Sequence, residues 1–236
     1  HVRTIEVRWL TRLVCGASRC AARGRIPFRN FEQMPRIVRA FHGTTLSNAR
    51  AMLSGSSPFQ PSANAHDWLG HGIYFFEESQ TLALDWAVGK VGSLAALGRT
   101  EEPAVIGADL QLDDCLDICS GDWGPALSLI HRRLSATLKT QHGPVTTTAA
   151  GRHVVLADIQ MPGSTWTFNY TDCAVMDAIV RDQQKIGRKI TSKRAAFADG
   201  SQLYPNSYLL SRTHVQIAVI DLSIVSNAAI VYPTLP

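Results

Sequence analysis

The chain has 236 residues, of which 45% are hydrophobic and 18% are charged. This length suits one substantial domain, and a mean hydropathy close to zero is typical of globular proteins. No apolar run approaches the roughly 20 residues that a membrane-spanning helix needs, so we expect no membrane partner.

The formal charge of +4 is unevenly distributed along the chain. Residues 1–39 hold nine Arg and two Glu, which gives +7, whereas the remainder of the chain carries −3. Because polyanion binding needs clustered cations, a nucleic-acid-binding function would rest on this N-terminal arm alone. We therefore expect residues 1–34 to form a basic, poorly ordered extension and residues 35–236 to form the folded domain. An arm that contacts an acidic partner is the competing interpretation.

Cysteine and histidine spacing indicates neither a metal site nor a disulfide framework. The five cysteines are irregularly placed and no Cys-x-x-Cys pair occurs, which favours a reducing compartment and a cytoplasmic location. The eight histidines are scattered without ligand spacing, so we expect no metal. We expect His66 and His71 to contact phosphate or solvent rather than zinc.

The first half of the domain is expected to alternate between strands and helices. The β-branched and aromatic residues of 36–41 predict a strand, and 45–55 reads as a helix with a Thr or Ser cap and Gly55 as its stop. Residues 54–71 are rich in Ser, Gly, Pro and Asn and predict a long loop. A strand over 72–77 and an amphipathic helix over 79–91 follow.

The second half continues in the same way. We expect a strand over 104–112, a helix over 124–139 and a helix over 172–185. The stretch 140–170 is ambiguous apart from a strand candidate at 153–159. The chain closes with three predicted strands, over 194–198, 213–222 and 228–233. Strands at both ends with helices between them predict an α+β fold.

Two short motifs combine residues that suit a flat ligand. "FHGT" (41–44) supplies an imidazole and a bare backbone at the expected end of a strand, and "GIYF" (72–75) supplies a phenol ring. Glycine backbone groups can pair with a planar amide, the ring can stack on it, and the imidazole can bond a sugar hydroxyl. In the alternative interpretation, His42 caps the next helix and Tyr74 belongs to the core.

These motifs, with "QIAVID" (216–221), resemble the ADP-ribosyltransferase superfamily, in its poly-ADP-ribose-polymerase-like or diphtheria-toxin-like branch with a His-Tyr-Glu triad. The resemblance covers residues 36–92 well and 213–222 moderately. The stretches "DCAV" and "THVQIAV" are similar to those of a group of uncharacterised bacterial members. The resemblance implies split antiparallel β-sheets flanked by helices, with NAD as the substrate.

The resemblance assigns NAD binding to six residues: His42, Gly43, Thr44, Trp68, Gly72 and Tyr74. It implies that His42 bonds the adenosine-ribose 2′-hydroxyl and that the Gly43 backbone pairs with the nicotinamide carboxamide. Tyr74 would stack on the nicotinamide ring, and Trp68 in the donor loop would close it from the other side. A loop anchor in the core is the alternative role of Trp68.

Where the family has its triad glutamate, this chain has Gln216, counted back from Asp221. In the family, that carboxylate binds the nicotinamide-ribose hydroxyl and stabilises the positive charge that develops as the glycosidic bond opens. Glutamine keeps the hydrogen bond but loses the charge, which predicts slower catalysis unless another group compensates. His214, on the same strand face, is the candidate helper base, with a structural role as its alternative. Glu77 and Glu78 rank below it.

The resemblance implies a mono-ADP-ribosyltransferase that cleaves NAD and transfers ADP-ribose to a macromolecular acceptor, either protein or nucleic acid. Single transfer follows because chain elongation in the superfamily is associated with the glutamate. A bacterial toxin or phage-defence setting fits this activity. The alternatives are an NAD glycohydrolase, a catalytically inactive NAD- or ADP-ribose-binding module, and a nucleic-acid binder that acts through the basic arm.

Overall fold

The computed structural model describes residues 35–64, 67–139, 159–160, 167–168 and 170–234. The chain divides into two units, His1–Met34 and Pro35–Pro236, and all described residues belong to the second. The expected basic extension over 1–34 and all but the last residue of the strand candidate at 153–159 therefore lie outside the described residues.

The described elements confirm the general α+β class. The helices are α1 (Leu46–Ser54), α2 (Gln80–Ala95), α3 (Gly124–Lys139) and α4 (Tyr170–Lys185), with 3₁₀ turns η1 (Ile118–Ser120) and η2 (Leu222–Ile224). The strands are β1 (Ile37–Thr45), β2 (Ile73–Glu77), β3 (Pro103–Gln111), β4 (Cys115–Asp117), β5 (Ile159–Gln160), β6 (Thr167–Phe168), β7 (Ser192–Phe197), β8 (His214–Val219) and β9 (Val225–Tyr232). None of the described helices is long and apolar enough to span a membrane.

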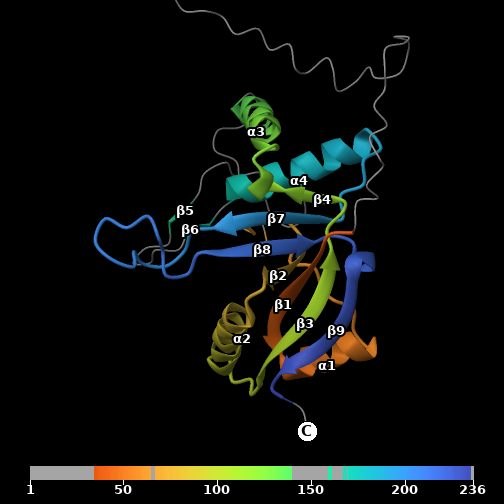
Figure 1. Ribbon diagram of the computed structural model, residues 1–236, viewed down its shortest axis with the longest axis vertical. Helices are drawn as coiled ribbons and strands as arrows, with labels where there is room; N and C mark the ends of the chain where they lie inside the picture. Colours follow the sequence, from red (N-terminus) through yellow and green to blue (C-terminus); the bar gives the residue numbers. More distant parts are fainter. Residues whose placement is uncertain (1–34, 65–66, 140–158, 161–166, 169, 235–236) are drawn as a thin grey trace, which may run out of the picture. The chain divides into compact units, whose positions relative to one another are not determined.

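Seven strands form one mixed sheet in the order β4-β7-β8-β2-β1-β3-β9. Every neighbouring pair is antiparallel except β4 and β7, which run parallel. In Figure 1, β7 and β8 run across the direction of β1, β3 and β9. The sheet therefore has two differently oriented halves, and β2 lies where they meet.

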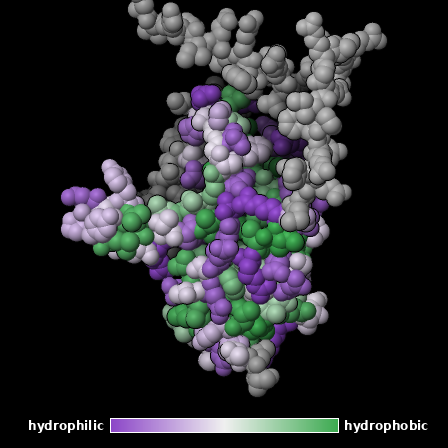
Figure 2. Space-filling model, in the orientation of Figure 1, coloured by the Kyte–Doolittle hydropathy of each residue, from purple (hydrophilic) through white to green (hydrophobic). Residues whose placement is uncertain are grey.

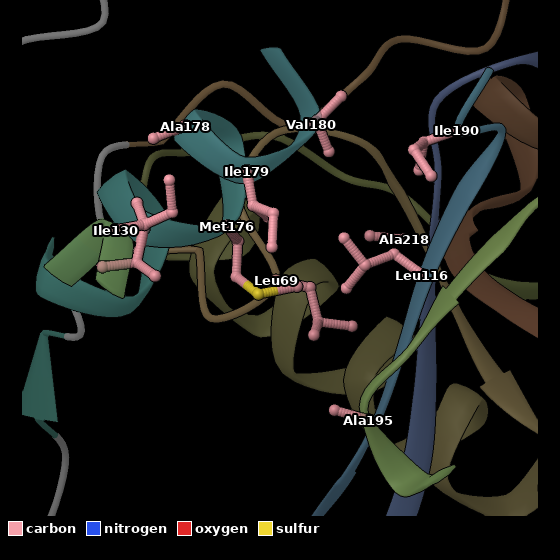
Figure 3. Close-up of a cluster of buried hydrophobic side chains, with 11 residues drawn as sticks. Leu69, Leu116, Ile130, Met176, Ala178, Ile179, Val180, Ile190, Ala195 and Ala218 are labelled. Atoms are coloured by element: carbon pink, nitrogen blue, oxygen red, sulfur yellow. The ribbon is translucent and has the colours of Figure 1, made fainter. Parts of the chain in front are cut away.

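Strand alternation separates the sheet into two faces. On the first, here called the α1 face, Phe75 packs with buried residues of β1, β3 and β8, and α1 covers the β3 and β9 side. On the opposite face, here called the α4 face, α2 packs on Phe76 and Val105 at one end. At its other end, Met176 and Ile179 of α4 pack on β4, β7 and β8 (Figure 3). Tyr74, Phe76 and Gln216 lie on the α4 face, whereas the His42 ring lies against Phe75 on the α1 face.

The start and stop signals of α1 act as predicted. Thr45 has extended backbone geometry, and its side chain accepts a hydrogen bond from the Asn48 N–H, which makes it the N-cap. Gly55 ends the helix with φ 74, a left-handed conformation that glycine adopts without strain. The alternative in which His42 caps this helix is therefore wrong.

β1 is longer than predicted, because its pairing with β3 continues from Ile37–Gln111 to Thr45–Pro103. His42 therefore lies inside the strand rather than at its end. The sequence pattern indicated the end too early because glycine and two threonines, which often mark a turn or a cap, follow the histidine.

The short strand β4 was not predicted. Its three residues are too few to show the alternation of apolar and polar residues that predicts a strand. Its place in the sheet depends on parallel pairing with β7, which is far along the chain. Arg194 of β7 ties these strands together, because its guanidinium bonds Asp117 of β4 at 3.1 Å and Glu77 of β2 at 2.6 and 2.8 Å. The 13% exposure of the Glu77 side chain makes this a largely desolvated ion pair.

The connection between β7 and β8 is a hairpin that projects from the sheet (Figure 1). Backbone hydrogen bonds join its two arms, from Leu203 N–H to Leu209 O at 3.0 Å and from Ser211 N–H to Ser201 O at 2.9 Å. Four large side chains are exposed on it: Leu203, Tyr204, Tyr208 and Leu209. Figure 2 shows one hydrophobic cluster on this otherwise mostly hydrophilic projection.

Candidate functional site

The neighbouring strands β1 and β2 separate at Gly43. They pair at only two positions, the last of which joins Phe41 to Phe76. The backbone N–H of Glu78, directly after β2, donates a hydrogen bond to the Arg39 carbonyl, so the backbone groups of Arg39 point toward β2. Because every second residue of a strand directs its backbone groups to the same neighbour, the N–H and C=O of Phe41 and Gly43 also point toward β2. A continued ladder would pair Gly43 with Tyr74. Since the ladder ends earlier, the backbone groups of Gly43 point toward β2 without a β2 partner among the described pairs.

The His42 side chain contacts the Tyr74 carbonyl, to which the Gly43 N–H would bond if the ladder continued. Its Nδ1 lies 2.8 Å from the Tyr74 carbonyl oxygen. Its ring lies against Phe75 and Phe59, with centroid distances of 5.5 and 6.2 Å. Because a carbonyl only accepts hydrogen bonds, Nδ1 carries the proton, and Nε2 of the neutral ring is left as an acceptor.

The electrostatic surroundings of His42 keep its ring neutral. Burial lowers the pKa of His42 to about 4, the hydrogen bond to Tyr74 opposes this shift, and the positive charge of Lys90 adds to it. Burial also lowers the pKa of Lys90, on α2. Sequence reasoning missed Lys90, since nothing in the helical pattern of α2 indicated that this lysine faces His42.

Gly43 is required for a reason other than the expected one. A Cβ at this position would lie 2.0 Å from the Ala83 carbonyl oxygen and 3.1 Å from the Ala87 nitrogen, both in α2. The bare face of Gly43 is therefore covered by a helix, while its in-plane backbone groups face β2. The glycine permits helix packing rather than the approach of a ligand from that face.

The hydroxyl of Tyr74 fixes the loop that precedes β2. It donates a hydrogen bond to the Gly70 carbonyl at 2.8 Å and accepts one from the Leu69 N–H at 2.9 Å. The ring packs against the hydrophobic cluster beneath α4, and burial raises the pKa of the phenol. These contacts give Tyr74 a structural role in the loop, while its ring lies on the α4 face next to the separation of β1 and β2.

Two further residues from the resemblance occupy structural positions. Gly72 pairs with Ser62 across the loop, and a Cβ on Gly72 would lie 3.0 Å from the Val219 carbonyl oxygen of β8. Thr44 is completely buried, on the strand face that is covered by α1, and its hydroxyl has no hydrogen-bond partner among the described residues. The Thr44 side chain lies on the face opposite to Gln216, and Gly72 has no side chain to offer a ligand.

A row of aromatic rings crosses the α4 face between the loop and β2. Trp68 lies 4.7 Å from Phe197, Phe197 lies 5.9 Å from His214, and His214 lies 5.3 Å from Phe76, measured between ring centroids. Trp68 is partly buried and packs on another ring, so it is anchored in the loop and also presents an aromatic surface. Sequence reasoning missed Phe197, which is distant along the chain.

Gln216 and His214 form a hydrogen-bonded pair next to this row, which confirms that they share a strand face. The His214 Nδ1 lies 2.6 Å from the Arg212 carbonyl and therefore carries a proton, so Nε2 accepts from the Gln216 side-chain nitrogen at 2.7 Å. This assignment leaves the Gln216 Oε1 as the acceptor that the pair presents. Phe76 pairs with both Gln216 and Phe41, which places Gln216 about 10 Å from β1, two strand spacings away.

The glutamates that follow "GIYFF" do not join this group. The Glu77 side chain binds Arg194 on the α1 face, opposite to the face of Gln216. Glu78 adopts φ 53, a left-handed conformation at the turn into α2. The charge of Glu77 is neutralised on the other side of the sheet, which argues against the last-ranked possibility that Glu77 replaces the missing triad carboxylate.

Comparison with known protein families, with curated proteins and with solved structures finds no match for this chain.

Proposed function

We propose that the chain is an NAD-dependent mono-ADP-ribosyltransferase with an ADP-ribosyltransferase-like fold. The observation that carries the proposal is the separation of β1 and β2 at Gly43, where a backbone N–H and C=O point toward β2 without a partner on that strand. A carboxamide is planar and offers one donor and one acceptor side, which is the complement of these two groups. The nicotinamide of NAD carries such a carboxamide.

The remainder of the site offers partners for the other parts of NAD. The unprotonated Nε2 of His42 is an acceptor for a hydrogen bond that a ribose hydroxyl donates. The charge of Lys90, which acts on His42, suits the pyrophosphate. The row of rings that includes Trp68 and Phe76 provides surfaces on which a planar base can stack.

In the proposed reaction, the bond between nicotinamide and ribose breaks and nicotinamide leaves with the electron pair. The Gln216 Oε1 accepts a hydrogen bond from a hydroxyl of the nicotinamide ribose, and the dipole of the amide faces the developing positive charge. An acceptor nucleophile then bonds to the ribose carbon and releases its proton. Because an amide stabilises a cation less than a carboxylate does, we expect slow turnover and single transfer.

The exposed hairpin between β7 and β8 supports a macromolecular acceptor. It leads directly into His214, and its exposed side chains include four large apolar ones, among them the fully exposed Tyr208. Asp199 and Arg212 are its charged residues and cancel each other, so the hairpin offers no attraction to a polyanion. These features favour a protein acceptor over a nucleic acid. The described cysteines are free thiols, which supports the cytoplasm as the location.

Incubation with labelled NAD and a cell lysate tests the proposal. We expect macromolecular label that protease destroys and nuclease does not, and at least about 100-fold less label with His42→Ala, which removes a ligand contact worth several kcal/mol. His131→Ala, an exposed histidine on α3, is the matched control and should label as the native chain does. The absence of label in the native chain, or full labelling by His42→Ala, would contradict the assignment.

The uncharged pair of Gln216 and His214 favours a second candidate function, an NAD-binding module without catalysis. Gln216→Glu separates the two functions. A transferase limited by the missing charge should cleave NAD at least about tenfold faster with the glutamate, since 1.4 kcal/mol is worth that factor. Binding with no cleavage in either protein supports the module, and nicotinamide release without an acceptor supports a glycohydrolase.

A further inference from the structure

A group of ionisable side chains, outside the proposed NAD site, fastens the loop before β2 to helix α4. The Asp177 Oδ1 accepts hydrogen bonds from the Lys193 ammonium at 3.1 Å and from the backbone N–H of His71 at 3.0 Å. The ammonium also donates to the His71 carbonyl at 2.9 Å. Because the Lys193 side chain is only 1% exposed, this ion pair is buried beneath the loop.

Three side chains of this group bring metal-binding atoms together. A ring nitrogen of His71, Sγ of Cys173 and a carboxylate oxygen of Asp177 all lie within 4.8 Å of one another. Cys173 and Asp177 are four residues apart on α4 and therefore lie on one helix face. The second oxygen of Asp177, Oδ2, lies 3.1 Å from the His71 Nδ1 and is not the atom that Lys193 bonds.

We propose that His71, Cys173 and Asp177 bind one zinc ion, with water as the fourth ligand. Imidazole nitrogen, thiolate sulfur and carboxylate oxygen are the ligands that zinc takes in proteins. With zinc bond lengths of about 2.0 to 2.3 Å, tetrahedral ligand atoms lie about 3.5 Å apart, so no separation in the group has to shorten by more than about 1.3 Å. His71 can supply this movement, because its side chain is 44% exposed and lies on a loop.

The buried Lys193 is compatible with a bound cation. Its ammonium contacts Oδ1, so Oδ2 remains for the metal. On binding, the thiol proton and any proton held between His71 and Asp177 leave to solvent. The resulting thiolate and the Asp177 carboxylate carry two negative charges against the three positive charges of zinc and Lys193, so the bound site has a net charge of +1.

Zinc at this position would act on the loop rather than on NAD. The ion would join His71 to α4, directly after the backbone groups of Leu69 and Gly70 that hold the Tyr74 hydroxyl. We therefore expect zinc to raise the thermal stability of the chain. Sequence reasoning expected no metal because it compared histidine spacing with that of other ligands, and it missed the i, i+4 pair of Cys173 and Asp177.

Metal titration of the purified full chain tests this proposal. After treatment with a chelator, the chain should take up one zinc ion in competition with a chromophoric indicator, and cobalt should give a thiolate charge-transfer band. His71→Ala and Cys173→Ala should each weaken zinc binding at least about tenfold, the smaller effect reported for supporting residues of metal sites. The matched controls, His131→Ala and Cys119→Ser, change exposed residues elsewhere and should bind as the native chain does.

No zinc uptake by the folded native chain would overturn the proposal, as would unchanged uptake by both His71→Ala and Cys173→Ala. Should the buried Cys173 substitution unfold the chain, His71→Ala decides, because its exposed side chain contributes little to the core. Loss of the cobalt band in Cys173→Ala but not in Cys119→Ser would identify the sulfur ligand.

Discussion

His42 is the residue whose chemistry is most tightly fixed by its surroundings. Its Nδ1 proton is committed to the Tyr74 carbonyl, and burial lowers its pKa to about 4. The folded chain therefore holds a neutral imidazole between pH 4 and 6.5, where the unfolded chain binds a proton. The Nε2 of this neutral ring is therefore a hydrogen-bond acceptor.

This difference in protonation predicts a pH-dependent stability. As the pH falls from 6.5 to about 4, the unfolded state binds a proton at His42 that the folded state does not bind. The stabilisation from the neutral His42 is therefore fully present above pH 6.5, and the free energy of unfolding falls as the pH drops through this window. This stabilisation amounts to about 3 kcal/mol. Urea unfolding of the native chain and of His42→Gln across this window measures the effect: the native chain should lose about 3 kcal/mol more. Parallel pH profiles would contradict a buried neutral His42.

Helix α2 and strand β1 form a tightly packed pair, and Gly43 is the point of closest approach. We expect Gly43→Ala to lower the free energy of unfolding by about 1 to 3 kcal/mol, because the added Cβ would lie 2.0 Å from the Ala83 carbonyl oxygen. Gly89→Ala in the same helix is the matched control, because a Cβ there meets no atom within 4 Å. It should stabilise the helix by about 0.5 to 1 kcal/mol. Equal effects of the two substitutions in urea unfolding would contradict this packing.

Local signals predicted much of the fold of the described domain. Helix caps such as Thr45, the α+β pattern and the shared face of His214 and Gln216 follow from propensity and strand period, which are properties of neighbouring residues. The registers between strands depend on residues far apart in sequence. For this reason the separation of β1 and β2, the parallel strand β4 and the contact between Trp68 and Phe197 could not be predicted.

The candidate site likewise combines predicted residues with unpredicted relations between them. The motif residues His42 and Gly43 are adjacent to the separation of the strands, as a ligand site there requires. The hydrogen bond from His42 to the Tyr74 carbonyl, which occupies the bonding position of Gly43, involves a backbone atom and leaves no sequence signal. Gln216 and His214 come within two strand spacings of Gly43 only because β2 lies between β8 and β1 in the sheet.

The proposed NAD site depends on a carboxamide that pairs with the backbone of Gly43. Nitrogen–proton correlation spectra of isotopically labelled chain, recorded during titration with NAD and with nicotinamide alone, test this most directly. We predict that both ligands shift the Gly43 amide signal strongly, while the amide of Gly107, which lies in the regular part of the β1–β3 ladder, changes little. A Gly43 signal that stays in place while either ligand binds elsewhere, or that shifts no more than Gly107, would contradict the account.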